Sequence, residues 1–330
     1  MTRPLLFLVL LTLLAVFSVL SLAVGPAGVV WPLSSWWENA GHQGTDGIVF
    51  WDLRMPRTLV AILAGAVLGL CGAALQGLLR NPLADPALLG ISGAGALGGV
   101  GALYFGIASL SIVAMPLAGL GAAAFAMAAL LLLAGRQPPP ATLILAGLAI
   151  NALVGALTWL ALALAPSPFA AAEALTWIMG TLDAASMQDA AMIAPFAALC
   201  AVLLLPLAKG LDALALGEDA AASLGVMPSR IRLMAVAGVA LGTGAVGAMV
   251  GALAFVGLVV PHALRPLAGA RPGALLLPSI IGGAVLTLAA DVVLRTGFSD
   301  VRLQLGVLTS LLGAPVFLWL VMRSRFGGRA

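Results

Sequence analysis

Charge, cysteine and histidine are all scarce in this sequence. Asp, Glu, Lys and Arg make up 8% of the 330 residues, and the chain has two Cys and two His. Soluble domains carry about 25% charged residues, so the composition excludes an ordinary soluble globular protein. Two cysteines cannot build a disulfide framework. Cys71 and Cys200 lie within apolar runs, where we expect small core residues.

The sequence also lacks the motifs of common enzymes. The phosphate-binding pattern Gly-x-x-x-x-Gly-Lys-Ser/Thr is absent, and no His, Cys or carboxylate cluster suggests a catalytic centre. The formal net charge of +3 reflects how Lys and Arg are distributed among the loops between the apolar runs, and it does not indicate nucleic-acid binding. We therefore expect a non-catalytic protein with no catalytic residues, no metal and no cofactor.

Apolar residues, by contrast, are abundant at 62% of the chain. A helix of about 20 residues crosses the roughly 30 Å hydrocarbon core of a bilayer. Runs such as 120–133 contain no polar side chain at all. We predict an all-α polytopic membrane protein with about ten transmembrane helices, whose candidate spans are 5–24, 56–79, 88–107, 112–134, 141–165, 190–207, 232–250, a short piece near 252–261, 275–294 and 304–322.

The spans are predicted to form a single transmembrane domain over 1–330. The longer polar connections are 25–53, 166–189 and 208–231. The first span could be taken for a signal peptide, because Ser21 to Ala23 resembles a cleavage site. Its apolar run is longer than that of a signal peptide, which favours an uncleaved helix.

An even number of spans places both termini on one side of the membrane, and the basic residues indicate which side. Eleven of the fifteen Lys and Arg fall on the side of the termini, and the exceptions are Arg54, Arg57, Arg295 and Arg302. Cytoplasmic loops are rich in Lys and Arg, so we predict a multi-pass membrane protein with both termini in the cytoplasm. The four exceptions need another explanation.

The forty glycines predict close helix packing, for example through Gly65, Gly69 and Gly72. The segment 90–99 holds so many glycines that we expect it to be unwound, as a wall of a translocation pathway. Five spans before 166–189 and five after it suit two inverted five-helix halves, although the internal sequence likeness is weak.

Several motifs occur in a fixed order along nearly the whole chain, from about residue 10 to 325. They are Arg54-Met55-Pro56-Arg57, QGLLRNPLADPALLGIS at 76–92, LGEDAAASLGV at 216–226, FVGLVVPH at 255–262, Asp291 with Arg295, and LGVLTSLLGAPVF at 305–317. Together they resemble the FecCD-type permease subunits of ATP-binding-cassette importers for iron-siderophores, haem and vitamin B12. The family's Arg-Leu-Pro-Arg reads Arg-Met-Pro-Arg here, and the string after His262 is shortened.

The resemblance implies a type II ABC importer permease fold and a homodimer that moves an iron chelate or vitamin B12 from periplasm to cytoplasm. The implied partners are a second copy of the chain, two ATP-binding subunits that hydrolyse ATP, a periplasmic substrate-binding protein and a metal-chelate substrate. It assigns Arg54, Arg57 and Arg295 to docking of the binding protein, a role that suits the planar fork of arginine. An alternative is that these arginines only anchor helix ends at lipid headgroups.

The segment 213–228 is similar to the family's cytoplasmic coupling helix, which inserts into the ATPase subunit. Acidic residues in its first turn and a glycine at its end are typical of a short helix. The residues assigned to coupling are Leu216, Gly217, Glu218, Asp219, Leu224 and Gly225. Candidate pathway residues are Gly90, Ser92, Gly93 and Trp177, the last of which could equally be a membrane-interface tryptophan.

The alternative function is an ion-coupled secondary transporter, which needs ionisable groups near the bilayer midplane. Spans two to five have none at their centres, and Asp183 and Asp291 fall near span ends. The ABC importer is therefore the favoured prediction, and the sequence does not specify which chelate is carried.

Overall fold

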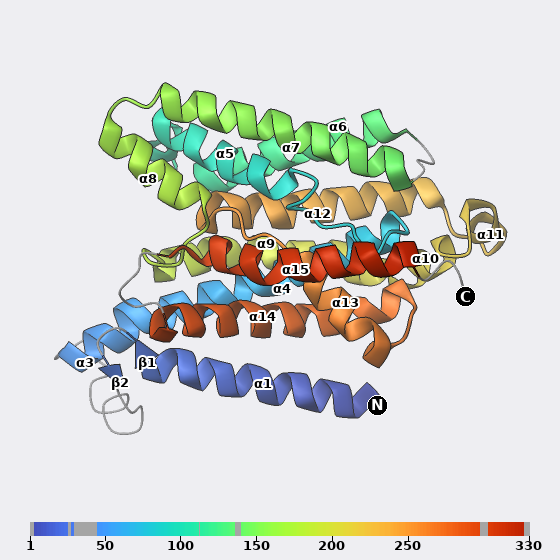
Figure 1. Cartoon of the computed structure of the whole chain (residues 1–330), viewed down its shortest axis with the longest axis horizontal. Coiled ribbons are helices and arrows are strands. Elements are labelled where there is room, and N and C mark those ends of the chain that lie inside the picture. The colour runs from blue at the N-terminus through green and yellow to red at the C-terminus, as the bar shows by residue number, and fades with distance from the viewer. Residues whose placement is uncertain are drawn as a thin grey trace.

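The computed structural model describes residues 3–25, 28–29, 45–111, 113–135, 140–297 and 303–326, and these form a bundle of helices with one short hairpin (Figure 1). The longer helices are α1 (Arg3–Ala23), α4 (Met55–Leu78), α5 (Ile91–Tyr104), α6 (Ala114–Ala134), α7 (Pro140–Ala163), α8 (Pro168–Ile178), α9 (Met187–Leu204), α12 (Pro228–Val250), α13 (Val256–Ala268), α14 (Pro272–Gly297) and α15 (Leu305–Phe326). The short ones are α3 (Thr45–Ile48), α10 (Ala208–Leu214), α11 (Glu218–Ser223), the π-helix η1 (Val49–Arg54) and the 3₁₀ turns η2 (Ile107–Ser109) and η3 (Leu205–Leu207). Strands β1 (Val24–Gly25) and β2 (Gly28–Val29) pair antiparallel.

Ten apolar helices match the ten predicted spans. Within the described residues, eight are long and apolar enough to cross a membrane, and α5 and α13 are shorter apolar helices. The prediction was least accurate for the short piece near 252–261, since α13 begins at Val256 and continues to Ala268. Helices α8 and α10 lie inside connections for which the sequence predicted no helix, because hydropathy does not identify short helices, whereas α11 lies where a short helix was predicted.

Two ends of the bundle can be distinguished in Figure 1. The hairpin end holds β1, β2 and α3, together with the start of α4 and the end of α14. The α11 end holds α10 and α11, and there α1 begins and α15 ends. Both ends of the described chain thus lie on the same side of the bundle, as an even number of crossings requires.

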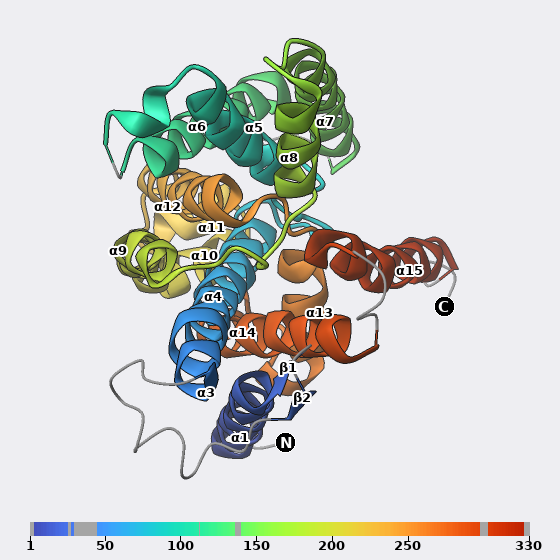
Figure 2. The ribbon, with the colours of Figure 1, turned by 90° about the vertical axis from the view of Figure 1, so that its left-hand side faces the viewer.

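Helix α4 lies at the centre of the bundle, with α9 and α12 on one side and α14 on the other (Figure 2). Its buried face includes Val60, Ala64 and Leu75, whereas α1 exposes most of its leucines at the periphery. A helix that is apolar all round is either buried or faces lipid. The core helix α4 and the peripheral helix α1 therefore use similar sequences in different surroundings.

Glycines bring α4 and α14 into backbone contact. A Cβ atom at Gly65 or Gly69 would collide with the backbone of Gly283 or Ser279, and one at Gly283 would collide with Gly65. Such small residues allow helices in a membrane to approach closely. The prediction of packing through Gly65 and Gly69 is confirmed, and α4 and α14 form a tightly fitted pair.

The prediction that 90–99 is unwound was wrong. Ile91–Tyr104 is the helix α5, and only its N-cap residue Gly90 has a left-handed backbone, with φ of 79°. The glycines serve packing instead, because a Cβ at Gly95 or Gly99 would press against the backbone of α12. Burial against α12 compensates for the low helix propensity of glycine. The inverted relation of the two halves stays a prediction.

Candidate functional site

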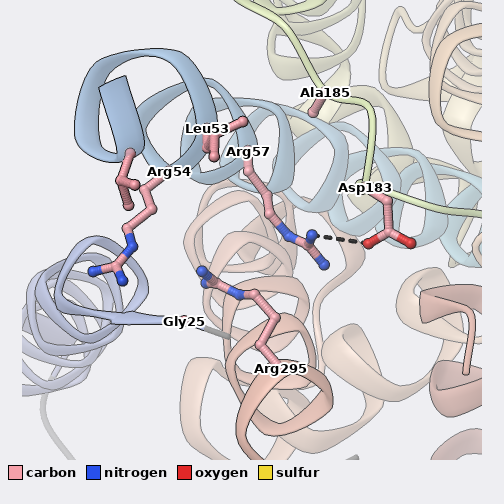
Figure 3. Close-up of a pocket in the computed structure, with 8 residues that line it drawn as sticks. Gly25, Leu53, Arg54, Arg57, Asp183, Ala185 and Arg295 are labelled. Atoms are coloured by element: carbon pink, nitrogen blue, oxygen red, sulfur yellow. Dashed lines mark hydrogen bonds and ion pairs between the residues drawn. The ribbon is translucent and has the colours of Figure 1, made fainter. Parts of the chain in front are cut away.

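A cavity of about 220 Å³ opens at the hairpin end, where α1 ends and α4 begins (Figure 3). Three arginine side chains lie here, Arg54 from the end of η1, Arg57 from the start of α4 and Arg295 from the end of α14. The cavity is lined by Gly25, Val49, Leu53, Arg54, Arg57, Asp183, Ala185 and Arg295. It therefore brings together the three arginines that the family resemblance assigns to docking.

Arg54 is buried and holds the end of α1. Its Nη1 donates to the carbonyl oxygens of Leu22 at 3.0 Å and Ala23 at 2.6 Å, and its Nη2 donates to Gly28 at 2.9 Å. The last carbonyls of a helix have no partner within the helix, and a cation there also interacts well with the helix dipole. With 4% of its surface exposed, Arg54 fastens α1 and the hairpin to the start of α4.

Arg295 makes a second set of bonds to the same helix end. Its Nη1 donates to the carbonyls of Ser21 and Val24, each at 3.1 Å, and its Nη2 donates to the Ser21 hydroxyl at 2.8 Å. The guanidinium also forms an ion pair of 2.9 Å with Asp291, one turn earlier on α14. Arg295 is only 7% exposed, so α14 and α1 are joined by buried polar bonds.

Arg57 differs from the other two because both bonds described for it go to carboxylates. Its Nε donates to Asp291 Oδ1 at 2.8 Å, and its Nη1 donates to Asp183 Oδ1 at 2.9 Å. The Asp291 side chain is fully buried, whereas that of Asp183 is 63% exposed. Arg57 thus joins an interior carboxylate to a surface carboxylate.

The three arginines that the resemblance assigns to docking all have partners within this chain, and their docking role stays a prediction. Arg54 and Arg295 already serve the end of α1, and Arg57 is already ion-paired. The sequence analysis did not pair Asp183 or Asp291 with Arg57. One signal was available: Asp291 and Arg295 are four residues apart, the spacing at which helical side chains meet.

The predicted coupling segment 213–228 contains one short helix, α11, which lies between the end of α10 and the start of α12. α11 begins after Gly217, whose φ is 113°, and ends before Gly225, whose φ is 76°. Glu218 and Asp219 occupy the first turn, as predicted. The side chains of Leu216 and Leu224 are exposed, and they flank α11. An apolar surface on a short polar segment is a candidate contact for another protein.

Polar bonds fix this segment to two long helices. Arg232 at the start of α12 forms a 2.6 Å ion pair with Glu218. Asp212 on α10 accepts a 2.7 Å hydrogen bond from the backbone N–H of Gly273, in the first turn of α14. The carboxylate satisfies one of the unpaired N–H groups at a helix start. These two bonds connect α11 to α12 and α10 to α14.

The pathway candidates come from two different elements. Ser92 and Gly93 lie on α5, and the backbone carbonyl of Ser92 is close to Gly247 of α12. Trp177 at the end of α8 donates its indole N–H to the Ala248 carbonyl of α12 at 3.1 Å. Both sets therefore contact neighbouring positions on α12. Their role in a pathway, and that of Gly90, stays a prediction.

The turn between α4 and α5 contains a buried carboxylate. Asp85 accepts hydrogen bonds from the backbone N–H groups of Ala87 at 2.8 Å and Leu88 at 3.2 Å. Burial raises the pKa of Asp85 to about 6, although the N–H groups of Ala87, Leu88 and Leu258 act to lower it. Its bonds therefore serve the fold of the turn.

Cys71 and Cys200 meet in the core, with their sulfur atoms 3.6 Å apart. Both are fully buried free thiols on α4 and α9. Among the described residues, no group of three or more His, Cys, Asp or Glu is placed to hold a metal ion. The functional chemistry of the described chain is therefore concentrated in the charged cavity and in the α10–α11 segment.

A bundle of ten apolar helices, with a charged cavity at one end and short polar helices at the other, defines a membrane-embedded permease subunit. Comparison with family descriptions matches residues 13–323 to the FecCD transport family. The chain belongs to this family of permeases of ATP-binding-cassette importers.

Named relatives support this membership. The vitamin B12 import system permease protein BtuC of Klebsiella pneumoniae is 38% identical over 304 residues, covering 92% of this chain and 89% of the relative. The Fe(3+) dicitrate transport system permease protein FecD of Escherichia coli is 37% identical over 321 residues, covering 94% and 96%. A solved structure of a metal-chelate type ABC transporter in an inward-facing conformation has a TM-score of 0.81 at 29% identity, covering 98% of this chain and 100% of that one. The predicted type II importer permease fold is confirmed.

Proposed function

We propose that this permease carries an iron chelate or vitamin B12 inward across the bacterial inner membrane. The relatives named for vitamin B12 and ferric dicitrate import support this cargo class. In this proposal two copies of the chain, each a single domain, form the membrane unit. Two separate ATP-binding subunits hydrolyse ATP, and an external binding protein delivers the cargo. The hydrophobic core extends from Leu6 on α1 to Leu308 on α15, in keeping with one domain.

The observation that carries the proposal is that one helix, α14, connects two chemically different ends of the bundle. α14 runs from Gly273, bonded to the α10–α11 segment, to Asp291 and Arg295 at the charged cavity. Its 26 residues span about 39 Å, enough to cross a bilayer. One continuous helix thus links the segment assigned to the ATPase with the cavity assigned to the binding protein. We infer that the hairpin end faces outward and that both termini face the cytoplasm.

In this arrangement Arg57 is the arginine best placed for docking. Its partner Asp183 is exposed, and the cavity beside it admits a further carboxylate. Arg54 and Arg295 add positive charge to the cavity while they remain hydrogen-bonded to backbone carbonyls at the end of α1 and in β1. A bidentate carboxylate contact suits the guanidinium, which keeps its charge at all physiological pH values.

The transport proposal is tested by reconstitution. The chain, its ATP-binding subunit and its binding protein are placed in liposomes, and uptake of radiolabelled cyanocobalamin, ferric dicitrate and a ferric hydroxamate siderophore is measured. We expect uptake of one of these classes, dependent on ATP hydrolysis and unaffected by collapse of the proton and sodium gradients. Uptake that stops when the gradients collapse, with ATP still present, would instead establish the ion-coupled alternative.

The buried carboxylate Asp291 bears on that alternative. A proton-coupled carrier needs an ionisable group that can exchange its proton during transport. Asp291 is held between Arg57 and Arg295 at 2.8 and 2.9 Å, so its carboxylate is engaged in two ion pairs within the bundle. These contacts favour a structural role for Asp291 over a role in ion coupling.

The docking and orientation proposals each have a direct test. Arg57→Glu is expected to weaken binding of the binding protein strongly, since a like-charge contact at an interface costs several kcal/mol. Normal import by the Arg57→Glu protein would remove Arg57 from the docking site. A cysteine introduced at Ser223 is expected to react with a membrane-impermeant maleimide only in inverted vesicles. Labelling in intact spheroplasts would reverse the orientation.

A further inference from the structure

Asp183 occupies the cavity face of Arg57 that an incoming carboxylate would need. The two side chains are joined at 2.9 Å, and Figure 3 shows the carboxylate of Asp183 directed at the Arg57 guanidinium. Asp291 binds the same guanidinium through a different nitrogen from the interior side. Arg57 is thus bound to one fixed partner and to one partner at the surface.

The two ion pairs differ in how readily they can be exchanged. Asp291 is fully buried, and removing a partner from a buried charge is costly. Asp183 is largely exposed, and exposed ion pairs contribute little because water and salt compete for both charges. A carboxylate from another protein can therefore replace Asp183 while Asp291 keeps the Arg57 guanidinium in position.

The charge of the cavity favours a further carboxylate. Three guanidiniums, from Arg54, Arg57 and Arg295, are accompanied at the cavity by the carboxylates of Asp183 and Asp291. Release of Asp183 leaves the cavity more positive and opens the volume beside Arg57. Electrostatic complementarity then favours an acidic side chain of the docking protein.

Asp183 is also part of a chain segment that ties several helix ends together. The Thr181 N–H donates to the Val250 carbonyl at the end of α12, at 2.9 Å. The Gly306 N–H, in the first turn of α15, donates to the Gly180 carbonyl at 3.1 Å. The segment 178–183 therefore joins α8 to α12 and α15, and Arg57 fastens this junction to α4 through Asp183.

We propose that Asp183 is the resting partner of Arg57, that a carboxylate of the docking protein replaces it, and that its release loosens the junction of α8, α12 and α15. This inference rests on the proposed docking at Arg57. Asp291 acts as a positioning residue, because it holds the Arg57 guanidinium during the exchange. Docking would thereby reach the ends of α12 and α15 through one exposed side chain.

The test uses the assembled transporter and the substrate-binding protein encoded beside it. Asp183→Asn and Asp183→Ser are compared with Glu173→Gln, which changes an exposed carboxylate on α8 outside the cavity. Because displacement of an exposed ion pair is no longer needed, we expect about twofold to fivefold tighter binding for both Asp183 variants, with Ser at least as strong as Asn. Glu173→Gln is expected to bind like the wild type.

Hydrogen exchange supplies a second readout. In the wild type, docking should accelerate exchange at the amides of Thr181 and Gly306, whose bonds form the junction. In Asp183→Ser without the binding protein, these amides should already exchange at the docked wild-type rate. Melting temperature and elution volume establish that each variant is folded, which the exposure of Asp183 favours.

Failure of this inference can be separated from failure of the docking proposal. The double variant Arg57→Gln with Asp291→Asn removes the guanidinium without leaving its buried partner charged. If this variant docks normally, Arg57 is not the docking residue. If it fails to dock, but Asp183→Ser matches the wild type in affinity and in exchange, the resting-partner role of Asp183 is wrong while docking at Arg57 stands.

Discussion

The two ends of α14 lie beside two candidate contact sites for other proteins, and these sites differ in chemistry. At the hairpin end, the charges of Arg57, Asp291 and Arg295 are bound to one another or to backbone carbonyls inside the bundle. At the α11 end, Asp212 binds α10 to the start of α14, and Glu218 binds α11 to the start of α12. Leu216 and Leu224 remain exposed there. Buried charges need ion-pair or hydrogen-bond partners in the free protein, before any other protein binds. Exposed leucines can remain in contact with water at a modest cost in free energy.

This difference predicts different forms of recognition. A partner at the hairpin end exchanges one ion pair for another, so association there should depend strongly on salt. A partner at the α11 end buries leucines, so that contact should depend little on salt and more on shape. The following predictions test this contrast, in order of decreasing effect on stability.

The largest effect is expected from Asp291→Ala. The change leaves Arg57 and Arg295 without their shared buried carboxylate, and loss of one member of a buried ion pair costs about 3–5 kcal/mol. We expect a strongly lowered melting temperature in detergent and poor yield. A matched change at the other end, Glu218→Ala, removes a pair whose side chains are 29% and 25% exposed, and should cost about 1 kcal/mol, well below the loss for Asp291→Ala. Equal losses for the two variants would contradict the contrast.

Asp85 provides a pH-dependent comparison with Asp291, since the bonds described for it come from backbone N–H groups. Its folded pKa of about 6 lies above the ordinary 3.8, so the protonated form is favoured by folding. Its contribution to stability is complete below pH 3.8 and is lost as the pH rises through 6. The shift corresponds to about 3 kcal/mol.

Replacing Asp85 with Asn should therefore flatten the dependence of melting temperature on pH between 4 and 7. Asn keeps an oxygen that can accept from Ala87 and Leu88, so the turn is preserved. Melting curves of both proteins across this range provide the measurement. The idea fails if the wild type and the Asn variant show parallel curves.

Arg54 and Arg57 should separate stability from docking. Arg54→Leu removes the donors to three carbonyls, of which the bond to Ala23 is buried, and one buried acceptor left without a partner costs about 1–3 kcal/mol. The variant should melt at lower temperature but bind the binding protein nearly as well as the wild type. Arg57→Gln leaves Asp291 paired with Arg295, so this variant should show the reverse emphasis, with docking most affected. Identical defects in the two variants would mean that both arginines share one role.

The smallest change in stability is expected at the α11 end. Replacing Leu224 and Gly225 with two aspartates alters exposed positions, and the positive φ at Gly225 costs an L-residue about 1 kcal/mol. The permease should remain folded but should no longer assemble with its ATP-binding subunit, as measured by size-exclusion chromatography. Full assembly and transport by this double variant would assign coupling to another segment.

Much of the fold could be predicted from the sequence because membrane insertion depends on local hydrophobicity. Ten apolar segments matched ten helices, and Gly225 was recognised as the glycine that follows the end of α11. The glycine-rich segment 90–99 was wrongly expected to unwind, since its helix depends on contact with α12 far along the chain. Local propensity describes one segment, and tertiary packing decides its conformation when the propensity is weak.

The sequence predicted only part of the candidate site. The sequence by itself determined that Arg54 and Arg57 stand at the start of an apolar helix, where their charge is exceptional. Only the tertiary structure decided that Arg54 binds the end of α1 while Arg57 binds Asp183 and Asp291, which are 126 and 234 positions away in the chain. The physical reason is that hydropathy acts on each segment as it enters the membrane, whereas an ion pair forms only between groups that the packed helices have brought within about 3 Å.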